Sequence, residues 1–301
     1  MTRFRSGPLS LALLLFASAW LLVGCQDDEP DVPPRVASTT SADGVPIAYT
    51  VTGAGPDVVL VHCWCGNRTF YDSVLGDLAR DHRVIALDLA GHGESGDTRE
   101  DYTMQAFAAD VLAVMDAEQV REAVIVGHSM GGTVAMALAQ QAPRRVRGIV
   151  GIDNLHRVDD GHDRAQIDPL LAAMRDDFAG QVTAMVASMF PAGTDPDVIA
   201  LAREPMIATG PAVGISAFAH LFDFDLASAA RAYARPLDLV NDDGYPVDTE
   251  QWRAHGVDVR VTLLESVGHF PMFSAPDTLR LALREAVLTA GGGATGREIE
   301  G

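Results

Sequence analysis

A serine between two glycines is the residue of this chain best suited to nucleophilic chemistry. Residues 127–131 read Gly-His-Ser-Met-Gly, with Ser129 at the centre. The apolar, β-branched residues 123–126 predict a strand just before this segment, and residues 133–141 predict a helix after it. A serine on so sharp a turn needs neighbours without side chains two positions away, which the glycines supply. The pattern predicts a nucleophile elbow that carries Ser129.

A serine hydroxyl attacks only when a base takes its proton and a third group orients that base. We expect the base to be His269, in the segment Ser-Val-Gly-His-Phe-Pro-Met that follows the last predicted strand. The orienting acid is expected to be Asp243, after the preceding strand, with the adjacent Asp242 and the earlier strand-ending Asp153 as alternatives. Open α/β sheets place their sites at the carboxyl ends of strands, where all of these residues would meet. The sequence therefore predicts a triad in the order Ser129, Asp243, His269.

Four segments together resemble the α/β-hydrolase family. The elbow is one, and the order serine, aspartate, histidine matches the order in this family. Residues 62–66, His-Cys-Trp-Cys-Gly, follow the third strand, where the family forms half of its oxyanion hole. Residues 88–95, Asp-Leu-Ala-Gly-His-Gly-Glu-Ser, resemble the loop after the next strand, and residues 268–271, Gly-His-Phe-Pro, resemble the histidine loop. The resemblance covers about residues 36–290.

This resemblance implies a serine hydrolase that forms an acyl-enzyme on Ser129. The backbone N–H groups of Trp64 and Met130 would form the oxyanion hole, and the substrate would be a small-molecule ester with a small or medium apolar acyl group. The same triad serves C–C bond, lactone and amide hydrolysis and peracid formation, and a ligand-binding lipoprotein without catalysis is an alternative of another class. We expect neither a cofactor nor a metal. Cys63 stands where the family has glycine, so its side chain could narrow the acyl pocket.

Strands and helices alternate along the chain, which predicts a mostly parallel central sheet with helices on both faces. Residues 155–235 lack a clear strand and are rich in Ala, Met and Phe at helical spacing, so they predict a helical cap inserted between two strands. The expected strands are 36–40, 46–52, 57–62, 83–88, 123–126, 148–153, 237–240 and 259–264, and the expected helices of the main domain are 70–80, 102–119, 133–141, 248–255 and 278–289.

The first residues have the pattern of an export signal. Residues 1–24 combine two arginines with a long apolar stretch, and they end in Leu-Val-Gly before Cys25. This ending resembles the lipobox of bacterial lipoproteins, which implies lipidation of Cys25 and an anchor in the membrane. The glutamine that follows favours the outer membrane of a Gram-negative bacterium. Residues 25–35 are expected to be a tether, and residues 291–301 a disordered tail.

The charge balance excludes some classes of partner. The chain has 22 Lys plus Arg against 41 Asp plus Glu, a formal net charge of −19, and every one of its basic residues other than histidine is arginine. Such a surface disfavours nucleic acids, which we do not expect as partners. Beyond Cys25, only Cys63 and Cys65 remain. They are two residues apart on an extended segment, too far for a disulfide, and are expected to be free thiols.

Overall fold

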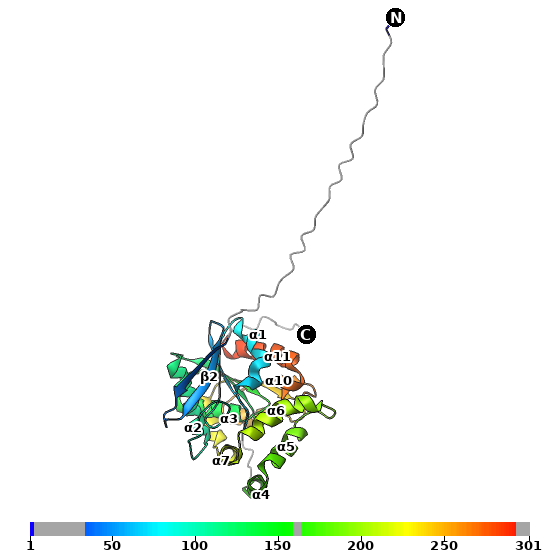
Figure 1. The fold of residues 1–301 in the computed structure, drawn as a ribbon. Coiled ribbons are helices and arrows are strands. Elements are labelled where there is room, and N and C mark those ends of the chain that lie inside the picture. Colours follow the sequence, from blue (N-terminus) through cyan, green and yellow to red (C-terminus); the bar gives the residue numbers. More distant parts are fainter. Residues whose placement is uncertain (3–33, 159–163, 293–301) are drawn as a thin grey trace.

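An eight-stranded sheet runs through the protein (Figure 1). The computed structural model describes residues 1–2, 34–158 and 164–292. The strands lie in the order β1-β2-β4-β3-β5-β6-β7-β8; β2 is antiparallel to both neighbours, and all pairs from β4 to β8 are parallel. The strands are β1 (Arg35–Thr40), β2 (Pro46–Thr52), β3 (Asp57–Val61), β4 (Arg83–Leu87), β5 (Ala123–His128), β6 (Val146–Ile152), β7 (Leu237–Asp242) and β8 (Val259–Leu264).

The central strands are apolar because both of their faces are covered. In β5 all six residues are buried, and in β3 and β4 four of five are. A continuous run of β-branched residues is the expected composition for a parallel strand between two layers of helices. Each of these strands ends at the same edge of the sheet, so the loops after β3, β5, β6 and β7 gather there.

Helices cover both faces of the sheet. On one face α1 (Asp72–Ala79) contacts α11 (Pro276–Ala290), and α10 (Pro271–Ser274) lies next to both. On the other face α2 (Met104–Ala117) packs against α3 (Met130–Gln141). Two short elements, η1 (Arg68–Tyr71) and α9 (Thr249–Ala254), complete the main domain within the described residues.

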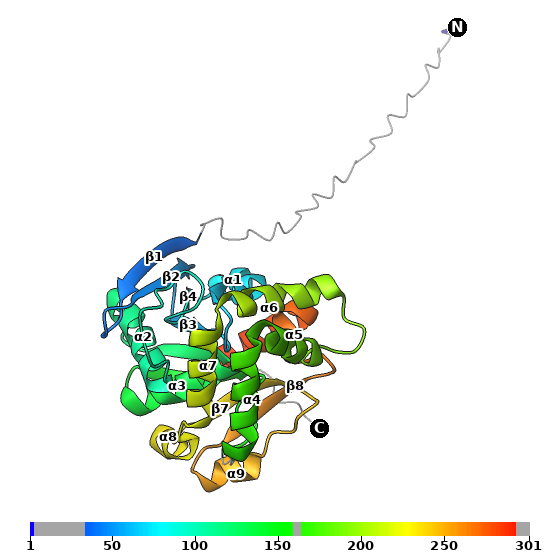
Figure 2. The same ribbon diagram turned by 60° about the horizontal axis from the view of Figure 1, so that its bottom comes forward.

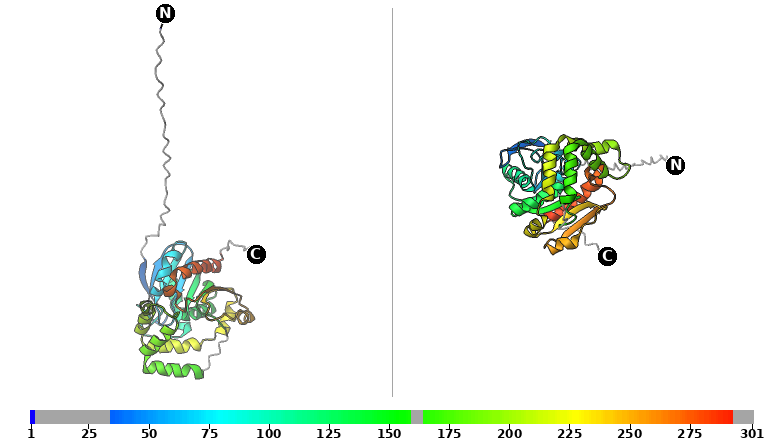
Figure 3. Two further views of the ribbon diagram at one scale, coloured as in Figure 1. Left: turned by 90° about the vertical axis from the view of Figure 1, so that its right-hand side faces the viewer. Right: turned by 90° about the horizontal axis from the view of Figure 1, so that it is seen from below.

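Five helices form a cap between β6 and β7. They are α4 (Arg164–Asp176), α5 (Phe178–Ser188), α6 (Pro196–Ala208), α7 (Pro211–Phe222) and α8 (Leu226–Tyr233). Aspartate side chains accept first-turn N–H groups at the starts of α5, α6 and α8, which explains why these helices begin where they do. Figure 2 shows α4 to α7 in front of the sheet, and the left view of Figure 3 shows the cap helices gathered at one end of it.

The parallel sheet with helices on both faces and a helical insertion is confirmed. Several boundaries shift by one to three residues, and two of the differences concern helices. Helix α3 begins at Met130, directly after the serine and three residues before the expected start, because the elbow turn leads into the helix without a loop. The short helix α10 was not expected, since four residues carry too little periodicity to be recognised.

Nearly all of the expected signal segment, Cys25, most of the tether and nearly all of the tail lie outside the described residues. Within residues 34–158 and 164–292, no single helix is both long and apolar enough to cross a membrane. Helices α6 and α7 meet that test of length and composition only as a pair, and this pair is bent by 98°.

Candidate active site

Ser129 lies on a strained turn between β5 and α3. Its backbone has φ 51° and ψ −118°, a conformation that L-residues rarely adopt. A Cβ on Gly127 would lie 2.3 Å from the backbone of Gly131, and a Cβ on Gly131 would lie 2.1 Å from the carbonyl oxygen of Val61. The turn therefore requires both glycines, as the sequence predicts for a nucleophile elbow.

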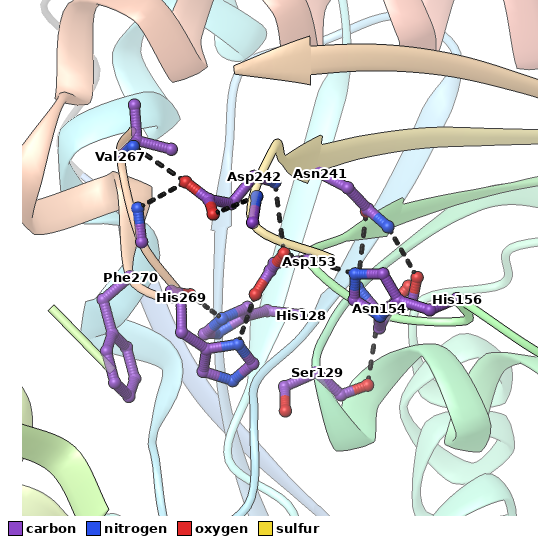
Figure 4. A network of polar contacts seen from close by, with 12 residues as sticks. His128, Ser129, Asp153, Asn154, His156, Asn241, Asp242, Val267, His269 and Phe270 are labelled. Atoms are coloured by element: carbon purple, nitrogen blue, oxygen red, sulfur yellow. Dashed lines mark hydrogen bonds and ion pairs between the residues drawn. The ribbon is translucent and has the colours of Figure 1, made fainter. Parts of the chain in front are cut away.

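His269 is held by a carboxylate from another strand. It lies in the loop after β8, and its Nδ1 is 2.5 Å from Oδ2 of Asp153, the residue that follows β6. Figure 4 shows the imidazole beside the side chain of Ser129 and joined to Asp153. Serine, histidine and aspartate all line one cavity.

The structure corrects the prediction that Asp243 orients His269. One oxygen of Asp243 accepts a hydrogen bond from the backbone N–H of Ser266 at 2.8 Å, and the side chain lies at the exposed edge of the loop. The neighbouring Asp242 accepts the N–H groups of Val267 and Gly268 at 2.8 and 2.7 Å. Both aspartates at the end of β7 thus hold the backbone of the histidine loop, and the imidazole pairs with the alternative acid, Asp153, after β6.

A second histidine approaches the same carboxylate. Nε2 of His156 lies 3.6 Å from Oδ1 of Asp153, which also accepts the N–H of Asp242 at 3.1 Å. Burial raises the pKa of Asp153, but the hydrogen bond from His269 and the proximity of His156 and His269 outweigh it, so the pKa lies below its usual range. Asp153 is therefore a carboxylate at neutral pH. His156 was not expected at the site, although its position three residues after a candidate acid was a signal.

The histidine of the elbow sequence supports the loop of His269. The Nε2 of His128 is 2.7 Å from the carbonyl oxygen of His269. Burial first, and then the nearby ring of His269, lower the pKa of His128 to about 3. The ring is therefore neutral at neutral pH, and its Nε2–H donates to that carbonyl.

Of the two expected oxyanion-hole residues, Met130 lines the cavity, whereas Trp64 is not among the described residues that line it. Met130 is the first residue of α3 and lines the cavity, and the first N–H groups of a helix have no partner within the helix. Trp64 lies after β3, with its indole buried under the cap, where Nε1 donates to the carbonyl of Gly214 at 2.8 Å and the ring packs on Phe178 and Phe218. The role of the backbone N–H groups stays a prediction.

The cysteines are free thiols, as predicted, and both are buried. Burial raises the pKa of Cys63 to about 12. Its sulfur points toward Gly66, where a Cβ would lie 2.8 Å away, and Cys63 does not belong to the cavity wall formed by the described residues. The expectation that this side chain could narrow the acyl pocket is wrong, because the side chain turns into the core.

The cavity above Ser129 has a volume of about 1390 Å³. Enclosed small-molecule sites commonly measure about 300–1,000 Å³, so this one also has room for a large substrate. Among the described residues, no group of three His, Cys, Asp or Glu side chains is placed to hold a metal ion. Much of the wall is apolar and comes from the cap: Met189, Phe190, Pro191, Leu221, Phe222, Phe224 and Leu226.

Comparison with protein families gives a match to the family described as alpha/beta hydrolase fold, over residues 56–196. An uncharacterized protein of Mycobacterium bovis is 40% identical over 123 residues, which is 40% of this chain and 35% of that protein. The chain thus spans about a third of the length of the curated relatives it matches first.

Solved structures resemble this fold over nearly their whole length. A thermophilic esterase from Thermogutta terrifontis superposes with a TM-score of 0.74 at 23% identity, covering 85% of this chain and 99% of the esterase. A hydrolase from Pseudomonas aeruginosa gives a TM-score of 0.73 at 26% identity, covering 86% of this chain and 99% of that protein. The overall fold of this chain thus has structural counterparts among solved proteins.

Proposed function

Since the chain belongs to the α/β-hydrolase fold family, we propose that it is a serine hydrolase of carboxylic esters with the triad Ser129, His269 and Asp153. The observation that carries the proposal is the hydrogen bond from His269 to Asp153, in the cavity that Ser129 also lines. A general base needs a carboxylate that orients its ring and a nucleophile beside it. His269 has both, in Asp153 and Ser129.

In the proposed mechanism, His269 takes the hydroxyl proton of Ser129 while the serine oxygen attacks the ester carbonyl. The ionised Asp153 orients the ring and stabilises the imidazolium that forms. The N–H groups of Met130 and Trp64 hold the oxyanion, a contribution of about 2.7–4 kcal/mol per donor in related chemistry. His269 then protonates the leaving alcohol, which leaves the acyl group on Ser129. In the second step His269 activates a water that attacks the acyl-enzyme, and the carboxylic acid is released.

The proposed substrate is a neutral ester with a small or medium apolar acyl group. The apolar cap residues of the cavity support this, because they would remove acyl CH₂ groups from water at about 0.8 kcal/mol each. The related esterase and hydrolase structures are consistent with ester chemistry. A panel of p-nitrophenyl esters of increasing acyl length measures how much of the cavity the acyl group uses.

The variant Ser129→Ala tests the proposal. We expect it to lose fluorophosphonate labelling and ester turnover by several orders of magnitude, because triad members act as a unit. The matched control is Ser188→Ala, in the same cavity wall, whose hydroxyl donates to the carbonyl of Met185 at 2.7 Å. The control should keep its labelling. Undiminished labelling of Ser129→Ala would contradict the proposed nucleophile.

A further inference from the structure

We propose that Asn154 is a positioning residue for the nucleophile, so that the adjacent pair Asp153 and Asn154 orients both partners of the reaction. The carboxylate of Asp153 holds His269, and the amide of Asn154 holds the turn of Ser129. The inference rests on the proposed function and assigns a role to a residue that takes no part in the chemistry itself.

The amide of Asn154 bridges the two ends of the elbow. Its Nδ2 donates to the carbonyl oxygen of Gly127 at 2.7 Å and to that of Ser129 at 3.2 Å (Figure 4). The orientation of the amide follows from these partners, because an amide oxygen placed against two carbonyl oxygens would be repelled. The side chain thus fixes the carbonyl groups on both sides of His128 and Ser129.

The space for this amide is provided by two glycines. A Cβ on Gly132, in the first turn of α3, would lie 2.2 Å from Nδ2 of Asn154, and a Cβ on Gly151, in β6, would lie 2.2 Å from its Oδ1. Asn154 is 7% exposed. The amide therefore fits between strand and helix with no freedom to turn away.

A second asparagine fixes the backbone of the first. Asn241, fully buried at the end of β7, accepts the N–H of Asn154 with its Oδ1 at 3.3 Å and donates from Nδ2 to the carbonyl of Asn154 at 2.8 Å. The ends of β6 and β7 are thereby joined directly beneath the elbow. Because its backbone is held by Asn241, Asn154 cannot move with Ser129, and its amide therefore restrains the turn.

Such a restraint matters because Ser129 is held in an unfavourable backbone conformation. Strained residues persist only where their surroundings fix them. Without the amide, the turn would relax and move the hydroxyl relative to His269, whereas the bond from His269 to Asp153 would stay. The loss would therefore fall on the attack by serine and leave the histidine–aspartate pair intact.

The test is Asn154→Ala, with acylation followed by pre-steady-state burst kinetics and by the rate of fluorophosphonate labelling. We expect acylation to fall about 10- to 100-fold, the size of effect that a misplacement of about 1 Å causes. KM and the acidic limb of the pH–rate profile should stay as in the wild type. Asn154→Asp should lose at least as much at neutral pH, because it keeps the shape but sets a carboxylate against two carbonyls.

Two further variants separate positioning from stability. Gly132→Ala leaves Asn154 in the sequence but displaces its amide, so it should lower acylation in the same way and serves if Asn154→Ala fails to fold. Ser41→Ala removes a buried hydrogen bond to Asp110, 2.6 Å long, and neither residue lines the cavity. This variant should lower stability without changing acylation.

Wild-type acylation rates in folded Asn154→Ala or Gly132→Ala would overturn the inference. A wild-type protein that takes no fluorophosphonate would instead overturn the proposed function. The two failures are therefore distinguishable.

Discussion

The three aspartates that the sequence offered as the acid, with Asp243 preferred, have three different roles. Asp153 pairs with His269, Asp242 fixes the backbone of the histidine loop, and Asp243 accepts one N–H at the exposed edge. The difference lies in what each carboxylate faces. A carboxylate orients an imidazole only where the ring's Nδ1–H reaches it. Here the carboxylates of Asp242 and Asp243, at the end of β7, accept backbone N–H groups instead.

This arrangement predicts the order of damage in three isosteric variants. Asp153→Asn should lower kcat by about 10⁴. The amide favours the wrong tautomer of His269, and it lacks the negative charge that stabilises the imidazolium. Asp243→Asn should stay close to the wild type, and Asp242→Asn should lie between them, since it weakens the loop that carries His269. Steady-state kinetics on one ester measures all three. If Asp243→Asn were the most damaged variant, the assignment of the acid to the residue after β6 would fail.

At the scale of elements, a buried histidine ties β3 to the loop after β4. His62 follows β3 directly, its Nε2 accepts the N–H of Leu89 at 3.0 Å, and its Nδ1 donates to the carbonyl of Cys63 at 2.8 Å. Burial lowers the pKa of His62 to about 4. The ring is neutral in the folded protein, because a proton on Nε2 would face the N–H of Leu89.

The shift predicts a pH dependence of stability. Between pH about 6.5 and about 4 the unfolded state binds a proton at His62 that the folded state does not, so stability rises with pH in this window and is lost as pH falls through it. Glutamine can also donate and accept hydrogen bonds but does not titrate. In His62→Gln, the slope of the unfolding free energy against pH should therefore fall by the amount that corresponds to about one bound proton. Urea unfolding at several pH values measures the slope. An unchanged slope would show that His62 does not titrate in this way.

At the scale of the whole molecule, the negative net charge bears on how the protein could be held at a membrane. The net charge of −19 on the whole chain would keep it away from anionic headgroups, so a covalent anchor would be needed to hold the protein at a membrane. We propose that Cys25 carries this anchor, on the strength of the Leu-Val-Gly-Cys ending. Two or more acyl chains give stable attachment, whereas one gives only reversible binding.

The corresponding variant is Cys25→Ser in the full chain. We expect it to move the protein from the membrane fraction to the soluble fraction, with esterase activity per molecule unchanged, because Ser129 and His269 belong to the folded domain. Fractionation and intact-protein mass spectrometry provide the measurement. A mature N-terminus without lipid would refute the anchor and leave the proposed activity untouched.

The sequence by itself determined the strands, the cap and the elbow, because buried β-branched runs, helical periodicity and glycine pairs are local signals. Ser129 and His269 came from the same local patterns and lie together as expected. The tertiary structure alone decided the partner of His269, the inward turn of Cys63 and the bridge made by Asn154. Each of these depends on which side chain faces which across the ends of β5, β6 and β7. Residues that meet there are far apart in the chain, and neighbouring aspartates present the same carboxylate, so only the packing of the strands and loops could choose between them.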